Sequence, residues 1–123
     1  MAKIKPGKNA SKKDVITQKA AALFKAKGFS SASMRELAES VGVEAPSLYN
    51  HIGSKSEILQ TICFKVANAF TLYLNTTENT GISTIIMLEN IIRFHIRMML
   101  NNFDEVYVAN HEWKHLKDRK SVV

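Results

Sequence analysis

Residues 33–57 read SMRELAESVGVEAPSLYNHIGSKSE, and this segment carries the strongest structural signals of the chain. Two short helical patterns lie on either side of Gly42, which permits the left-handed backbone of a tight turn. Ala38 is small, so the second helix can cross the first closely. Apolar residues that hold the angle between the helices flank the turn, namely Leu37, Val41, Val43 and Leu48. The stretch therefore predicts a helix-turn-helix over residues 33–52, whose second helix is a rigid rod able to enter a major groove.

Capping signals mark where these helices and the next one begin. Ser33 and Glu36 have the spacing of a capping box, and residues 54–57 repeat that spacing. Gly53 is expected to end the second helix. A long helix then follows and runs toward residue 75, with apolar residues at helical spacing along its inner face.

Helical spacing of apolar residues continues on both sides of this region. Residues 1–10 are interpreted as a flexible basic tail, and a first helix follows from the capping-box spacing of residues 11–14 to Gly28. Residues 76–81 form a polar loop before two further helices. Because no β-type alternation is sustained, the predicted class is all-α. The predicted domains are the tail 1–10, a DNA-binding domain 11–57, and a connecting helix with a partial helical effector and dimerisation domain over 58–123.

The helix predicted over residues 83–101 is apolar around most of its circumference. Its polar stripe consists of Glu89, Arg93, Arg97 and Asn101. We therefore expect this helix to be central and mostly buried, with its polar stripe exposed to solvent. The last helix is predicted over residues 104–117, and Trp113 is expected on its buried side. Cys63 is expected to be a buried thiol on an apolar helix face.

The charge of the chain is +6 over 123 residues, and it is unevenly spread. Residues 1–60 hold ten Lys/Arg and five Asp/Glu, a net of +5, whereas residues 61–123 hold seven and six, a net of +1. A basic module favours a polyanion, since each neutralised phosphate releases counterions. One cysteine excludes a disulfide framework and indicates a reducing cytoplasm. No apolar run is long enough for a transmembrane helix.

Residues 33–59, together with AALFKAKGF at residues 21–29, resemble the TetR family of bacterial transcriptional regulators. The most specific elements are Leu48-Tyr49-x-His51 and Ser54-Lys55, in register behind Gly42. The resemblance implies a three-helix DNA-binding domain followed by a helical ligand and dimerisation domain. Family members usually continue with further helices, so we expect a truncated form in which the last two helices leave apolar surface uncovered.

The resemblance also implies which residues contact double-stranded DNA. The expected backbone anchors are Ser33, Tyr49, His51 and Lys55. The expected base readers are Arg35, Pro46, Ser47 and Asn50, with Ala45 offering apolar contact to a thymine methyl group. Taken singly, Tyr49 also fits a half-buried core residue, His51 a surface histidine and Lys55 an exposed first-turn lysine. The implied protein is a repressor in the bacterial cytoplasm, associated with the nucleoid, that binds a near-palindromic operator as a homodimer.

A small-molecule effector is the second partner that the resemblance implies. The candidate pocket residues are Phe94, His95, Met98, Met99 and Trp113, with His95 and Arg97 as sources of polar groups. A methionine and aromatic stripe at helical spacing also fits an ordinary core, and that interpretation is the favoured one. No cofactor is expected.

Residues 111–115 read HEWKH, which matches the H-E-x-x-H pattern of zinc hydrolases. On a helix this pattern would place two imidazoles on one face, with Glu112 as general base. A catalytic zinc needs a third protein ligand, and none of the eight residues after His115 is His, Glu or Cys. We therefore expect neither a metal site nor an enzyme. A third hypothesis is an interaction module whose basic face binds RNA or a membrane.

Overall fold

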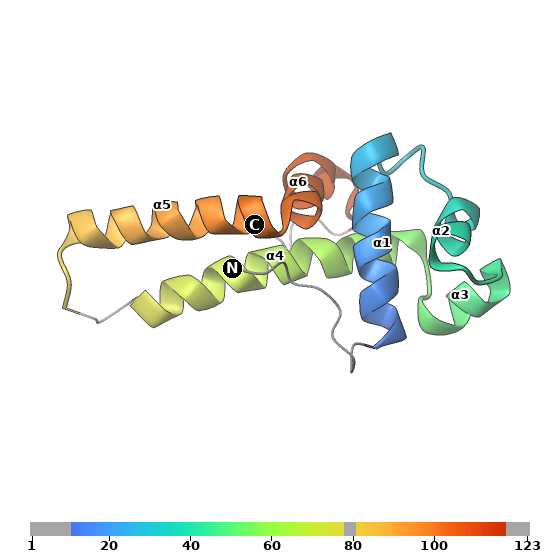
Figure 1. Cartoon of the computed structure of the whole chain (residues 1–123), viewed down its shortest axis with the longest axis horizontal. Coiled ribbons are helices and arrows are strands. Elements are labelled where there is room, and N and C mark those ends of the chain that lie inside the picture. Colours follow the sequence, from blue (N-terminus) through green and yellow to red (C-terminus); the bar gives the residue numbers. More distant parts are fainter. Residues whose placement is uncertain (1–10, 78–80, 118–123) are drawn as a thin grey trace.

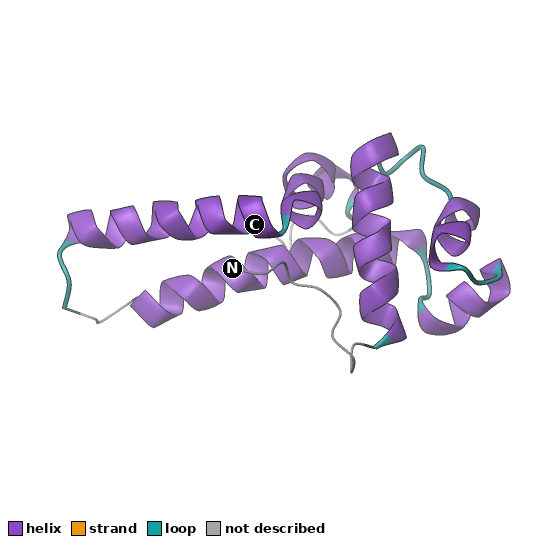
Figure 2. Cartoon of the chain, viewed as in Figure 1, coloured by secondary structure: helices purple, strands orange, loops and turns teal. Residues whose placement is uncertain are grey.

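The computed structural model describes residues 11–77 and 81–117, and that part of the chain is helical without strands (Figure 2). The helices are α1 (Lys12–Lys27), α2 (Met34–Val41), α3 (Ala45–His51), α4 (Lys55–Thr77), α5 (Thr84–Asn101) and α6 (Phe103–Glu112), and a 3-10 turn, η1, covers Trp113–His115. The all-α prediction is confirmed. The basic tail predicted over residues 1–10 lies outside the described residues.

The capping predictions hold at the first two helices and differ at the third. Ser11 and Ser33 each form a reciprocal capping box, with Asp14 and Glu36 as their partners. At the start of α4 the Ser54 hydroxyl accepts a hydrogen bond from the backbone N–H of Glu57, as expected. The Glu57 carboxylate, however, accepts from the N–H of Gly53 and not from that of Ser54. The side chain of Glu57 therefore caps the backbone one residue earlier in the α3–α4 connection than the capping-box pattern predicts.

The helices form a head and an arm (Figure 1). Helices α1, α2 and α3 form the head, and α4 leads away from it. Helix α5 returns along α4, and α6 packs on both α4 and α1. The main core cluster joins the head to the C-terminal part, because it includes Val108 of α6 and Leu116 besides residues of α1–α4. A second, smaller cluster of Val66, Met98 and Val106 holds α4, α5 and α6 together.

The prediction that α5 is mostly buried is wrong. Met98 is the buried residue of this helix, whereas the Ile85 side chain is 79% exposed and Ile92 is 50% exposed. Helix α5 packs on α4 and α6 with one side, and no other described element covers the opposite side. The expectation of uncovered apolar surface is confirmed for α5.

The prediction that Trp113 lies on a buried helix face is wrong, because its side chain is 44% exposed. Helix α6 ends at Glu112, and the tighter winding of η1 turns the indole away from the direction that a continued α-helix would give it. Cys63, by contrast, is buried as expected. Across the described ranges, no helix combines the length and the apolar character needed to cross a membrane.

Candidate nucleic-acid interface

The turn between α2 and α3 is built as the sequence predicts. Gly42 adopts a left-handed conformation with φ 84° and ψ 29°, and its N–H donates to the carbonyl oxygens of Ala38 and Glu39. The side chains of Leu37, Ala38 and Leu48 are buried between the helices. Helix α3 is therefore anchored by its inner face and cannot rotate without breaking this contact.

The outer face of α3 is exposed and carries most of the predicted DNA contacts. Pro46, Ser47, Asn50 and His51 are exposed, and Tyr49 is 50% exposed. None of these side chains takes part in the main core cluster. Ala45 differs, because it is half-buried and packs against that cluster. The structure thus brings five of the predicted residues together on one short, rigid helix and turns the sixth partly inward.

The N-terminus of α2 holds the next two predicted residues. The Ser33 hydroxyl accepts from the N–H of Glu36 at 3.1 Å, and the Ser33 N–H donates to the Glu36 carboxylate at 3.1 Å. A hydrogen bond to Lys27 lowers the pKa of this carboxyl group, and bonds from Ser33 add to the effect. Arg35 lies beside this cap and is exposed, and within the described part of the chain it forms no hydrogen bond or ion pair. Its guanidinium is available to a ligand.

Lys55 is placed differently from the other predicted residues. Its ammonium donates to the carbonyl oxygen of Phe29 at 2.6 Å and to that of Ala32 at 3.0 Å. It also lies 4.4 Å from the centre of the Phe29 ring. An ammonium has three donors, so two of them are committed to the loop between α1 and α2 and one remains. Lys55 therefore ties the start of α4 to the head.

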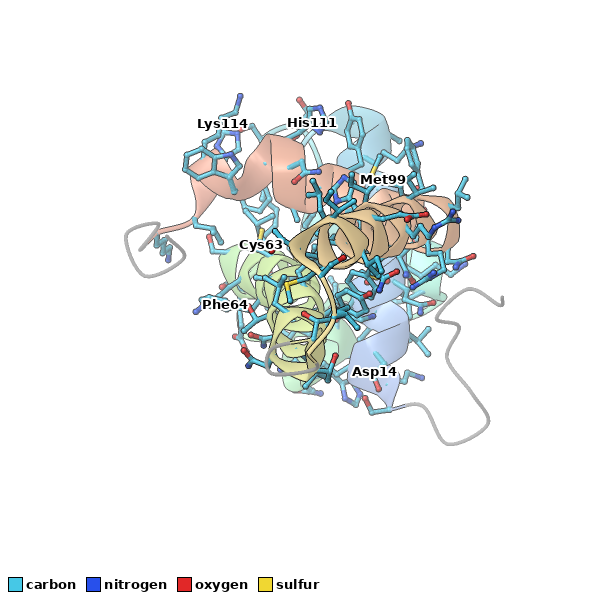
Figure 3. All side chains as sticks on the ribbon, turned by 90° about the vertical axis from the view of Figure 1, so that its left-hand side faces the viewer. Asp14, Cys63, Phe64, Met99, His111 and Lys114 are labelled. Carbon is cyan, nitrogen blue, oxygen red and sulfur yellow. The ribbon has the colours of Figure 1, made fainter. Side chains whose placement is uncertain are left out.

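A hollow of about 360 Å³ lies between α4 and α6, away from the face of α3. Its lining is mostly apolar and consists of Cys63, Val66, Ala67, Phe70, His95, Ala109, Asn110 and Trp113. Figure 3 shows Cys63 between the ribbons of α4 and α6. Burial raises the pKa of its thiol to about 11, so the thiol is neutral at pH 7.

Two of the five predicted pocket residues, His95 and Trp113, line this hollow. The other three are core residues instead. Phe94 stacks on Tyr73 with ring centres 4.1 Å apart, Met98 is buried, and Met99 packs on the smaller core cluster. The residues that α4 contributes to this lining were not predicted, although residues 63, 66, 67 and 70 share one helical face at the spacing i, i+3, i+4, i+7. The lining residues of α6 were not predicted either, because only tertiary packing brings that helix next to α4.

The wall of this hollow is connected to the head. The ring of His115 stacks on Phe29 at 5.5 Å with an interplanar angle of 24°, and its Nε2 lies 3.3 Å from the Glu112 carboxylate. Phe29 is also the residue whose carbonyl binds Lys55. Trp113 and His115 belong to the same 3-10 turn, so one short segment contributes both to the lining of the hollow and to the contact with the head.

The zinc interpretation of residues 111–115 lacks the helix that it requires. Because α6 ends at Glu112, His111 and His115 do not share a helical face. The Nδ1 atom of His111 lies 2.9 Å from the carbonyl oxygen of Tyr107, and its ring stacks on the ring of that residue. In residues 11–77 and 81–117, no three His, Cys, Asp or Glu side chains are grouped as metal ligands.

Comparison with known proteins connects this arrangement to a family. The family model described as bacterial regulatory proteins, tetR family, matches residues 16–62, which comprise most of α1 through the first part of α4. The HTH-type transcriptional repressor KstR2 of Mycolicibacterium smegmatis is 34% identical over 62 residues, which are 50% of this chain and 30% of that protein.

Solved structures resemble a longer part of the chain. The TetR family transcriptional regulator PfmR from Thermus thermophilus superposes with a TM-score of 0.78 and 26% identity, over 87% of this chain and 59% of that one. The superantigen PfiT gives a TM-score of 0.74 with 24% identity, over 94% of this chain and 62% of that one, and supports the fold alone. The chain thus spans under a third of KstR2 and about three fifths of these two solved structures.

Proposed function

We propose that this chain is a sequence-specific DNA-binding repressor of transcription that responds to a small ligand, since residues 16–62 match the model of the tetR family of bacterial regulatory proteins. The observation that carries the proposal is the geometry of α3. Its inner face is held in the core by Leu48, and its outer face exposes Ser47, Tyr49, Asn50 and His51. A short rigid helix of this kind can enter a major groove with its N-terminal residues at the base edges.

The proposed contacts divide into two groups. Arg35, Pro46, Ser47 and Asn50 face the base edges, where arginine suits guanine and asparagine suits adenine. Ser33, Tyr49 and His51 contact phosphates, and Lys55 contributes its one remaining donor there. Ala45 is proposed as a minor apolar contact, because it is already half-buried against the core. This head corresponds to the proposed DNA-binding domain 11–57, which acts in the bacterial cytoplasm at the nucleoid.

The proposed response to a ligand rests on the hollow between α4 and α6. A small, mostly apolar molecule could bury its surface against Val66 and Phe70 and pair a polar group with His95 or Asn110. The same turn that carries Trp113 carries His115, which stacks on Phe29 of the head. A ligand that shifts this turn would therefore change how the head packs against the rest of the chain. Such a change couples ligand binding to DNA binding, as a ligand-released repressor requires.

The function is tested by selecting bound sequences from random duplex DNA. We expect a near-palindromic consensus with half-sites about one DNA turn, roughly 34 Å, apart, and an affinity that falls steeply with salt. Failure to obtain any consensus would contradict the proposal. Equal binding of duplex RNA or of anionic vesicles would support the interaction-module hypothesis in its place.

Ligand binding has its own experiment. Trp113 is the chain's one tryptophan, so its fluorescence reports directly on the hollow. Small aromatic and aliphatic compounds are titrated against the chain and against an Ala67→Leu variant, in which the longer side chain fills the hollow. A compound that changes the fluorescence of the parent chain but not of this variant, and that releases the selected DNA, supports the proposed response. Compounds that act equally on both chains contradict it.

A further inference from the structure

The ring of Phe29 is held by groups from three separate parts of the chain. The Lys55 ammonium at the start of α4 lies 4.4 Å from the ring centre, and the His115 ring of η1 stacks on it with centres 5.5 Å apart. Phe24 of α1 meets the same ring edge to face at 5.2 Å. Phe29 is 8% exposed, and in a close-packed interior a displacement of its ring is transmitted to all three neighbours.

The loop between α1 and α2 fixes the position of the Lys55 ammonium. The ammonium donates to the carbonyl oxygens of Phe29 and Ala32, and the loop itself is closed by a hydrogen bond from the Ala32 N–H to the Gly28 carbonyl oxygen. Two of the three ammonium donors are committed, so the third has a defined direction. A lysine held in this way loses little rotamer freedom when it meets a phosphate. The strength of that contact therefore depends on how firmly Phe29 is held.

His115 supports Phe29 from the turn after α6. Its Nε2 atom lies 3.3 Å from the Glu112 carboxylate, and the next residue, Leu116, is buried in the same core cluster as Phe29. The Leu116 N–H donates to the Trp113 carbonyl oxygen at 3.0 Å, which closes the turn. The His115 side chain is 34% exposed, so shortening it removes the stack without opening a cavity deep in the core.

We propose that His115 is a positioning residue for DNA binding, which acts through Phe29 on the ammonium of Lys55. The inference rests on the proposed function, because it requires that the remaining donor of Lys55 meets a phosphate. A phosphate contact carries no sequence information of its own. The turn η1 thus sets how tightly the chain binds duplex DNA, whereas the exposed residues of α3 set which sequence it binds.

The first experiment compares the parent chain with His115→Ala and His115→Phe on the selected duplex. Loss of the stack in His115→Ala should raise the dissociation constant by about three- to tenfold, the effect of one more side chain that must be ordered on binding. The order of preference among single-base variants of the duplex should not change. His115→Phe keeps a ring on Phe29 and should restore most of the affinity. An altered base preference, or equal weakening in both variants, overturns the proposal.

His111→Ala is the matched control for the loss of a histidine near the end of α6. His111 is exposed, and its ring stacks on Tyr107 instead of on Phe29. This variant should bind the duplex with the dissociation constant of the parent chain. A loss of affinity equal to that of His115→Ala would mean that the stack on Phe29 is not the cause, and it overturns the proposal.

The second experiment tests whether His115 acts through Lys55. In a Lys55→Met background the ammonium is absent, so His115→Ala should change the dissociation constant by less than about twofold. A general contribution of His115 to the fold would instead lower the affinity equally in both backgrounds, and that result overturns the proposal. Circular dichroism establishes that each variant is folded. Lys55→Gln, which keeps a donor for one of the two carbonyl oxygens, is the second background if Lys55→Met does not fold.

Failure of this inference and failure of the proposed function give different results. A parent chain that selects no duplex contradicts the proposed function. A parent chain that selects a duplex, together with a His115→Ala variant that binds it with parental affinity, overturns only the inference about His115.

Discussion

The ammonium group of Lys55 lies 2.6 Å from the carbonyl oxygen of Phe29 and 4.4 Å from the centre of the same residue's ring. His115 stacks on that ring as well. One aromatic residue at the end of α1 is thus contacted both by the start of α4 and by the turn after α6. Lys55 is better described as a residue that positions the head than as one that only binds phosphate.

Replacing Lys55 with methionine should destabilise the chain by about 1–3 kcal/mol, because it leaves the carbonyl oxygens of Phe29 and Ala32 without their donor. Urea unfolding followed by circular dichroism measures this change. Lys19→Met is the control, because it removes an exposed lysine of α1. A Lys55→Met variant of parent stability would show that this lysine serves the DNA alone.

Replacing Arg35 with alanine should relax the sequence preference at one base position by about 1–3 kcal/mol. Tyr49→Phe removes only a hydroxyl group and should weaken binding evenly across sequences. Binding of the selected operator and its single-base variants, measured by fluorescence anisotropy, separates the two effects. Arg97→Ala is the matched control, because it removes an exposed arginine from α5. If Arg35→Ala lowered the affinity for every sequence equally, its role would be that of a phosphate contact.

Replacing Gly42 with alanine should cost about 1 kcal/mol of stability, since φ is 84° and a Cβ atom is disfavoured there. No described atom lies within 4 Å of the added Cβ, so the cost is conformational and not a clash. Gly42→Asn should therefore be milder, because asparagine tolerates this region. Thermal unfolding of both variants provides the measurement. Equal losses would mean that some other property of the turn is responsible.

The Cys63 thiol should react slowly with an aromatic disulfide reagent at pH 7 and faster only as the pH rises above 9. Burial raises its pKa from 9.0 to about 11, so the reactive thiolate is scarcer in the folded chain than in the unfolded one at any pH below that value. The raised pKa favours the folded state below pH 9, and this contribution falls as the pH rises toward 11. Reaction in urea is the control. Equal rates in folded and unfolded chains would contradict burial of this side chain.

The helix-turn-helix was predictable from residues 33–57 because its signals are local. Capping pairs, Gly42 and the short apolar spacings act within a few residues of one another, and the structure repeats them nearly unchanged. The surroundings of α5 were not predictable in this way. An apolar helix such as α5 can be buried or can expose a contact surface, and the choice depends on which other elements reach it.

The candidate site shows the same division between local and distant information. The exposure of Tyr49, Asn50 and His51 follows from the amphipathic spacing of a single helix. The position of Lys55 does not, because its partners Phe29 and Ala32 lie more than twenty residues earlier in the chain. Likewise, Trp113 was misplaced because nothing in the local pattern told the end of α6 from a continuing helix.

The core beneath α1 and α3 includes Val108 and Leu116, residues that follow the end of α3 at His51 by more than fifty positions. During synthesis, α3 therefore leaves the ribosome long before the residues that complete the core against which the head folds. A nascent chain holding only residues 11–57 has the proposed DNA-contacting residues without the full core that supports their geometry. DNA-binding activity should accordingly appear late in translation, which limits premature capture of the operator by unfinished chains.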